Sequence, residues 1–193
     1  MPSIKDSGFG SFYLNNSRYS LSSPYPTNNQ PLFGRGIDGN VVLGPGSYNI
    51  NTARLGSNAV ASRTIDSAVA LVTVISGSTL TITMQAGVLG DFQIDDYCVL
   101  VNLQGSSSFN SNVGNWEFVK INATPTLTTI SLGAAPSKNY GQTDNTNLSG
   151  QQVLLMRIPE YQNLTLKNMA TLTCSAWNGT WGGLLMFALR YFL

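Results

Sequence analysis

The acidic side chains are the first residues to consider for chemistry, because the chain of 193 residues contains no histidine. Histidine is the commonest general base and the commonest metal ligand, so both roles would fall to other residues. Asp91, Asp95 and Asp96 form a local group of carboxylates that could bind Ca²⁺ together with nearby carbonyl oxygens. Their spacing lacks the order of an EF-hand loop, and the alternative is a solvated loop. We therefore expect no metal and no cofactor.

Glu117 offers a second chemical possibility, because two carboxylates that flank a sugar bond can hydrolyse it. Paired with Asp96 it would give such a site, but the sequence does not set the distance between the two groups. We expect no catalytic residues and predict that the protein is not an enzyme.

The tryptophans are candidates for recognition, since a flat ring buries apolar area while its rim keeps polar contacts. Trp116 lies in a strand-like run and is expected in the core. Trp177 is expected to pack on the Asn-Gly turn that follows it. Trp181 lies between a threonine and a glycine, and it is the tryptophan that we expect to meet a ligand or partner.

Composition favours an extracellular or virion protein and excludes a nucleic-acid binder. Only 10% of the residues are charged, against about 25% in ordinary soluble domains, while 42% are hydrophobic. The net charge is +1 and no cluster of Lys and Arg occurs, so the long-range attraction that nucleic-acid binding needs is missing.

Neither a membrane span nor a leader is expected. The longest apolar run, residues 184–189, is far shorter than the roughly 20 residues that span a bilayer. The start at Met1 has no apolar stretch typical of a signal peptide. With an extracellular type of composition, this favours assembly inside a cell before release, as phage and other virus structural proteins do.

Alternation of apolar and polar residues predicts an all-β protein. Residues 67–75 and 79–84 predict a hairpin with its turn at 76–78, because Leu80, Ile82 and Met84 alternate with threonines. Short strands separated by Ser, Asn and Gly loops indicate a sandwich or barrel. Further strands are predicted at 41–43, 97–103, 116–121, 127–132, 153–159, 164–166, 172–174 and 184–189.

Three other segments carry expectations. The strand 184–189 is apolar at every position, so it should need cover on both faces. The polar loop 135–150 is long enough to predict a function or a partner contact. Cys98 and Cys174 are expected to be buried free thiols, although a disulfide between neighbouring strands is the alternative.

Residues 1–33 are predicted to form an extended N-terminal arm, followed by a single all-β domain over residues 34–193. The segment is rich in Ser, Asn, Tyr and Pro and has few large aliphatic residues, so it should not form a core. Its spaced aromatics could dock into a neighbouring subunit, and a disordered tail is the alternative. These aromatics are Tyr13, Tyr19, Tyr25 and Phe33.

The order of several motifs resembles a β-rich module of secreted bacterial surface proteins and phage tail or fibre-like proteins. The motifs are GDFQIDDYCVLVNLQG, NVGNWEFVKI, QQVLLMRIPEYQNLTL and TLTCSAWNGTWGGLLMFAL, and the resemblance covers roughly residues 60 to 189. It implies a sandwich- or barrel-like β domain that leads into a short β-helix-like C-terminal strand stack. In that family the chain continues into further rungs.

Together these observations predict a virion structural protein that acts through oligomeric β-rich contacts, as a capsid decoration or cement protein or a tail or fibre component. The alternatives are a cell-surface adhesin or filament subunit, located outside the cell, and a carbohydrate-binding module. Expected partners are further copies, with a trimer favoured, neighbouring virion or surface proteins, and a host-surface glycan. The predicted contact residues are Tyr13, Tyr19, Tyr25, Phe33, Trp181 and Phe187.

Overall fold

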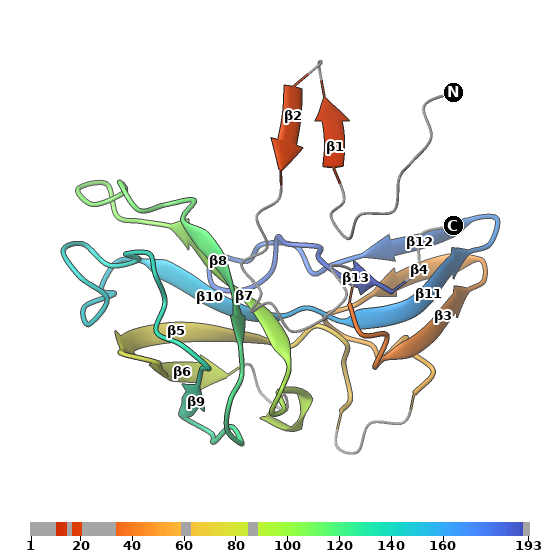
Figure 1. The fold of residues 1–193 in the computed structure, drawn as a ribbon, viewed down its shortest axis with the longest axis horizontal. Coiled ribbons are helices and arrows are strands. Elements are labelled where there is room, and N and C mark those ends of the chain that lie inside the picture. The colour runs from red at the N-terminus through yellow and green to blue at the C-terminus, as the bar shows by residue number, and fades with distance from the viewer. Residues whose placement is uncertain (1–10, 15–16, 21–33, 59–62, 85–88, 191–193) are drawn as a thin grey trace.

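The computed structural model describes residues 11–14, 17–20, 34–58, 63–84 and 89–190, and it is an all-β protein, as predicted (Figure 1). A single short 3₁₀ turn, η1, occurs in these ranges at Leu89–Asp91. The strands are β1 (Ser11–Leu14), β2 (Ser17–Ser20), β3 (Gly39–Leu43), β4 (Gly46–Asn49), β5 (Val69–Ser76), β6 (Thr79–Met84), β7 (Tyr97–Gln104), β8 (Trp116–Lys120), β9 (Thr129–Ser131), β10 (Gln152–Arg157), β11 (Glu160–Leu166), β12 (Ala170–Thr173) and β13 (Ala188–Leu189).

Six of these strands form one antiparallel sheet in the order β8-β7-β10-β5-β6-β9. The sheet curls on itself (Figure 1), and an antiparallel bridge between Ile121 and Leu132 joins its two edges. The N–H of Gly133 donates to the carbonyl of Lys120 at 2.9 Å beside this bridge. We call this unit the barrel, and it confirms the barrel-like part of the prediction.

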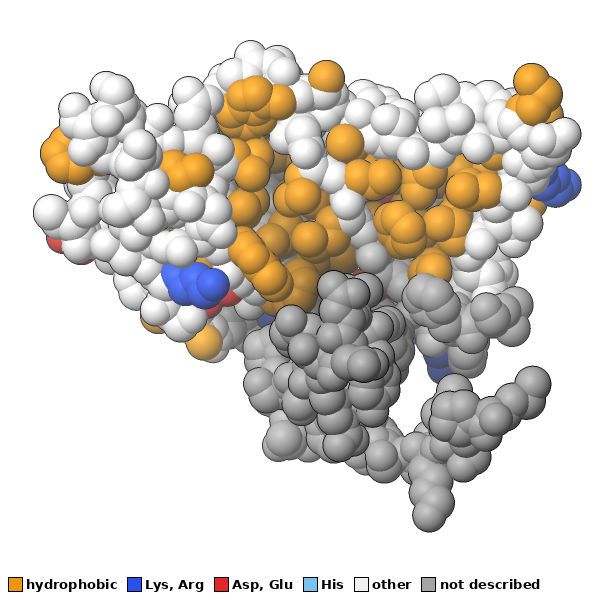
Figure 2. Space-filling view, turned by 90° about the horizontal axis from the view of Figure 1, so that it is seen from above, with side chains coloured by type: hydrophobic (Ala, Val, Ile, Leu, Met, Phe, Trp, Pro, Cys, Tyr) orange, Lys and Arg blue, Asp and Glu red, His pale blue; other side chains and the backbone are white. Residues whose placement is uncertain are grey.

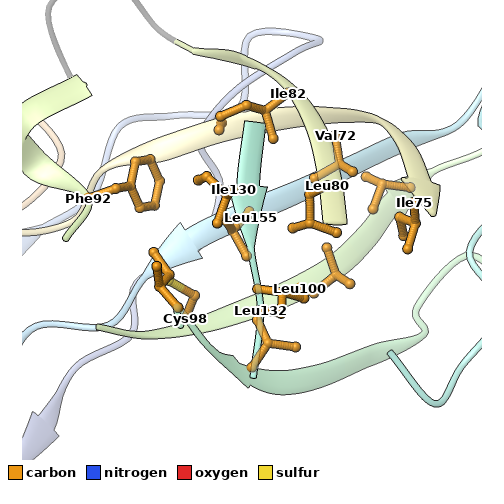
Figure 3. Packing of buried hydrophobic residues seen from close by; sticks show 14 of the residues in the cluster. Val72, Ile75, Leu80, Ile82, Phe92, Cys98, Leu100, Ile130, Leu132 and Leu155 are labelled. Carbon is orange, nitrogen blue, oxygen red and sulfur yellow. The ribbon is translucent and has the colours of Figure 1, made fainter. Parts of the chain in front are cut away.

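The barrel interior is built by the alternation that the sequence shows. In β6, Leu80 and Ile82 point inward and the threonines between them are exposed. Figure 3 shows such aliphatic side chains converging with Phe92 and Cys98. Each fully buried large aliphatic side chain contributes about 1.5–3 kcal/mol. Cys98 is a buried free thiol, as expected, and burial raises its pKa; Cys174 is also free but only half-buried, so the expectation of its burial is wrong.

The loop 135–150 contributes to the barrel core. Its Tyr140 is fully buried and its Leu148 nearly so, and both belong to the same apolar cluster as the barrel strands. The N–H of Ile75 also donates to the Asn145 carbonyl at 2.9 Å. Part of this loop therefore packs against its own domain, while its predicted function or partner contact stays a prediction.

A second unit consists of parallel strands stacked in two rungs. Rung 1 comprises residues 39–49 (β3 and β4), and rung 2 comprises residues 160–173 (β11 and β12). β11 lies between β3 and β13, and β12 pairs with β4, all in parallel. This stack confirms the β-helix-like part of the prediction. The barrel is inserted between the two rungs, which the sequence analysis did not predict.

Burial differs between the two rungs. Val41 and Leu43 of rung 1 are buried, while Leu166, which lies opposite Leu43 in rung 2, is 49% exposed. The loop after β4 covers the β3 edge, because Ser57 exchanges hydrogen bonds with the backbone of Asn40. On the other edge of β11, within the described chain, β13 pairs only with Glu160 and Tyr161, the first two residues of the strand. No described strand therefore pairs on that edge beside Leu166, at the far end of β11, and its side chain is exposed.

The predicted strand 184–189 is wrong over most of its length, because only Ala188 and Leu189 pair with a neighbour. Leu184 and Met186 are half-buried against the outer face of the barrel sheet, while Leu185 between them is 41% exposed. The segment is therefore covered on one face, with its backbone outside the sheet.

The predicted N-terminal arm falls largely outside the described residues. Within it, β1 and β2 pair as an antiparallel hairpin, with Tyr13 opposite Arg18 and Tyr19 opposite Phe12. The side chains of Tyr13 and Tyr19, and the whole of Tyr25 and Phe33, lie outside what the structure describes.

Candidate partner and ligand surfaces

Four buried charged side chains hold the barrel to rung 1. Asp38 precedes β3, Arg63 precedes β5, Asp96 precedes β7 and Arg157 ends β10. Arg157 Nη2 donates to both Asp38 oxygens at 2.9 and 2.8 Å, and Arg63 bridges Asp38 at 3.0 Å and Asp96 at 2.8 Å. Two guanidinium groups thus balance two carboxylates, and we call this set the ion cluster.

The charges of the ion cluster are stabilised by one another. Burial by itself lowers the pKa of Arg157, but the nearby carboxylates of Asp96 and Asp38 raise it above its ordinary value. A buried ion that loses its partner is strongly destabilising, so the cluster couples the two units through their charges. It explains why a chain with few charges places several of them in its interior.

A second set of polar contacts extends the junction into rung 2. Glu160 accepts from the Arg35 side chain at 2.7 Å, and its own N–H donates to Asp38. Asp66 accepts from the Tyr161 hydroxyl at 2.7 Å and from the N–H of Leu55 at 2.9 Å. Burial raises the pKa of Asp66, although these two hydrogen bonds oppose the effect.

The three carboxylates considered for Ca²⁺ point to separate partners. Asp91 is buried and accepts from Thr64 and from the N–H of Ile65. Asp96 belongs to the ion cluster, and exposed Asp95 pairs with Lys120 at 2.6 Å. The solvated-loop alternative holds only for Asp95. Within residues 34–58, 63–84 and 89–190, no group of three metal-ligating side chains is placed to hold an ion.

Glu117 and Asp96 do not form a hydrolytic pair. Glu117 lies opposite Leu100, and Asp96 lies four positions before Leu100, so about 13 Å of strand separates them. Glu117 accepts from the N–H of Ser137 at 2.9 Å and of Lys138 at 3.1 Å, and from the Tyr140 hydroxyl at 2.9 Å. Its carboxylate fastens residues 137–140 to β8, and we call these contacts the Glu117 clamp.

The predicted contact residues Trp181 and Phe187 both have partners within the chain. Trp181 is half-buried against the outer face of the barrel sheet. The Phe187 ring lies 6.0 Å from the ring of Tyr161, so it packs on the rung interior. Phe187 therefore supports the fold of this chain, and a role of Trp181 or Phe187 in partner contact stays a prediction.

Trp116 lies on the outside of the barrel, so the prediction that it belongs to the core is wrong. Val119 and Ile121 of the same run point into the barrel, which places Trp116 and Phe118 on the opposite face. Trp116 is 48% exposed, its ring meets Phe118 edge-on at 5.3 Å, and Lys138 Nζ lies 5.7 Å from its centroid. Lys138 was not considered from the sequence.

Apolar side chains gather on one face of the molecule. Figure 2 shows them as a broad region in the middle of that face. The C-terminal segment 181–188 contributes side chains that pack only partly against the barrel, with Leu185 outermost. We call this surface the apolar face. Its partly buried members are Leu71, Leu103, Phe118, Trp181, Leu184, Met186 and Ala188.

Comparison with known proteins gives little similarity. No protein-family model and no curated protein matches the chain. Among solved structures, it is similar to the Gp54 tailspike of Acinetobacter baumannii bacteriophage AP22, solved in complex with A. baumannii capsular saccharide. The identity is 14% and the TM-score 0.29, over 55% of this chain and 17% of the tailspike chain.

Proposed function

We propose that the protein is a non-catalytic structural component of a virion, and that it assembles with further copies of itself through the apolar face. The main observation that supports this proposal is the apolar face, a surface of partly buried apolar side chains next to Leu185, which is 41% exposed. Contiguous apolar surfaces of this kind mark interaction sites in soluble proteins. A trimer remains the favoured assembly, although a cell-surface adhesin or filament subunit would use the same surface.

The disposition of polar groups supports a structural role. The carboxylates of Asp38, Asp66, Asp91, Asp96 and Glu160 are buried and hydrogen-bonded to residues of this chain. They hold the barrel and the rungs together, so their chemistry is used for the fold. No helix in the described ranges is long and apolar enough to cross a membrane.

Light scattering of the full chain at micromolar concentration tests the proposal, and an oligomer is the expected result. Leu185→Lys should give smaller particles without lowering the thermal unfolding temperature, because Leu185 is exposed within one chain. Leu127→Lys is the control, since Leu127 is exposed in the loop between β8 and β9. A monodisperse monomer, or equal effects of both substitutions, would remove the basis of the proposal.

A further inference from the structure

The pair Trp116 and Lys138 stands apart from the contacts that hold the fold together. Trp116 begins β8, the strand at one edge of the barrel sheet, and about half of its surface is open. Its ring is held in place by the edge-on contact with Phe118. A tryptophan that is both exposed and oriented presents a rigid flat surface to solvent.

Lys138 supplies a positive charge beside this ring. Its Nζ lies 5.7 Å from the ring centroid, close to the outer limit of about 6 Å for a cation–π contact. Lys138 forms no ion pair with any acidic side chain of the described chain. The ammonium group is therefore available to a carboxylate of a ligand at little cost.

The Glu117 clamp fixes the backbone that carries Lys138 relative to β8, which carries Trp116. Glu117 directly follows Trp116 in β8, and it accepts hydrogen bonds from the backbone of Ser137 and Lys138. Tyr140, which is fully buried, donates to the same carboxylate at 2.9 Å. The loop is thus anchored at both ends of the stretch 137–140. A preorganised backbone loses less conformational entropy when a ligand binds.

We propose that Trp116 and Lys138 form a binding site for an acidic saccharide, in which the indole face stacks on a sugar ring and the ammonium group binds its carboxylate. The apolar C–H face of a pyranose matches the open indole, and one lysine matches one carboxylate. A polyanion such as nucleic acid would need several clustered cations, and the net charge of +1 does not provide them. This proposal rests on other side chains than the assembly proposed above does, and the two surfaces adjoin at Phe118, which the Trp116 ring contacts and which belongs to the apolar face.

The experiment titrates the full chain with galacturonate, hyaluronan and sialyl oligosaccharides, and binding is measured by calorimetry and by tryptophan fluorescence. At least one should bind saturably, and Trp116→Ala should weaken that binding about tenfold. Lys138→Gln should weaken it about three- to tenfold and abolish the preference over the methyl-esterified form of the same sugar. Trp177→Ala, on a separate turn, should bind as the wild type does.

Several results would overturn the proposal. The first is that none of the three acidic saccharides binds saturably. The second is that folded Trp116→Ala binds the saccharide as tightly as the wild type does. The third is that a polyglutamate peptide binds as tightly as the saccharide. Thermal unfolding of each variant shows whether it is folded. If Trp116→Ala does not fold, Trp116→Phe replaces it, and its reduced stacking area should still weaken binding measurably.

Discussion

Asp38 and Arg157 lie 119 residues apart in the chain, yet both oxygens of the carboxylate are within 2.9 Å of one guanidinium nitrogen. Asp38 precedes the first rung and Arg157 ends a strand of the barrel. The same carboxylate accepts from the N–H of Glu160, the first residue of rung 2. One side chain, which directly precedes rung 1, therefore contacts both the barrel and rung 2.

Replacing Asp38 with asparagine should lower the free energy of unfolding by about 3–5 kcal/mol, because two buried guanidinium groups would then share one carboxylate. Urea unfolding followed by circular dichroism measures the loss. The control is Asp95→Asn, which breaks an exposed ion pair with Lys120 and should cost no more than about 1 kcal/mol. Equal losses for the two variants would show that the cluster does not couple the units.

Asp66 should make stability depend on pH. Burial raises its pKa above 3.8, so the folded protein binds this proton more tightly than the unfolded chain does. The stabilisation that protonated Asp66 gives the folded state is complete below the ordinary pKa of an aspartate. It is lost as the pH rises through the pKa of Asp66 in the folded state. Relative to Asp66→Asn, the wild type should therefore gain stability as the pH falls from about 7 to about 4.

Urea unfolding of both Asp66 proteins at several pH values provides the measurement. The asparagine Oδ1 can accept the same hydrogen bonds from Tyr161 and Leu55, so the variant should keep its fold. A stability difference that is constant with pH, or that favours the wild type more strongly at high pH, would show that Asp66 titrates normally.

Glu117→Gln should loosen the loop 135–150. The substitution keeps the shape of the side chain but removes the charge that strengthens its hydrogen bonds with Ser137, Lys138 and Tyr140, at a cost of about 1–3 kcal/mol. Amide hydrogen exchange at Ser137 and Lys138 should become faster. Asp144→Asn removes a charge from an exposed part of the same loop, and exchange at those two amides should not change.

Met169→Asn should stabilise the protein. Met169 adopts a φ of 63° in the turn between β11 and β12, a conformation that disfavours most side chains and that asparagine tolerates. Its side chain is exposed, so little packing is lost, and the expected gain is about 0.5–1 kcal/mol. Thermal unfolding measures it. Leu127→Asn, another exposed position, should show no gain, and a destabilised Met169→Asn would contradict the explanation.

The barrel strands could be predicted from the sequence because their pattern is local. The hairpin of β5 and β6 follows from alternation and a glycine at φ 57°, which needs no knowledge of the rest of the chain. In rung 1 the short strand 41–43 could be predicted, but its pairing could not. Its apolar run is only Val41 to Leu43, and the strand that it pairs with begins more than a hundred residues later.

The position of Trp116 shows a second limit of prediction from the sequence. Both alternating sets in the run 116–121 contain apolar side chains, so periodicity does not reveal which set enters the barrel. The aliphatic Val119 and Ile121 do, which leaves Trp116 outside. The ion cluster had one sequence indication, since Arg157 directly follows the apolar run 153–156. Its carboxylate partners come from distant segments that no local pattern connects.

The insertion of the barrel between the two rungs leads us to expect an order of folding. Joining β3 to β11 in an otherwise unfolded chain would close a loop of well over a hundred residues. A folded barrel already holds Ser67 against Arg157, with the Ser67 hydroxyl donating to the Arg157 carbonyl at 2.8 Å. The remaining loop is then roughly four times shorter, which reduces the closure cost by about 1 kcal/mol. We therefore expect the barrel to fold first and the rungs to pair late in folding.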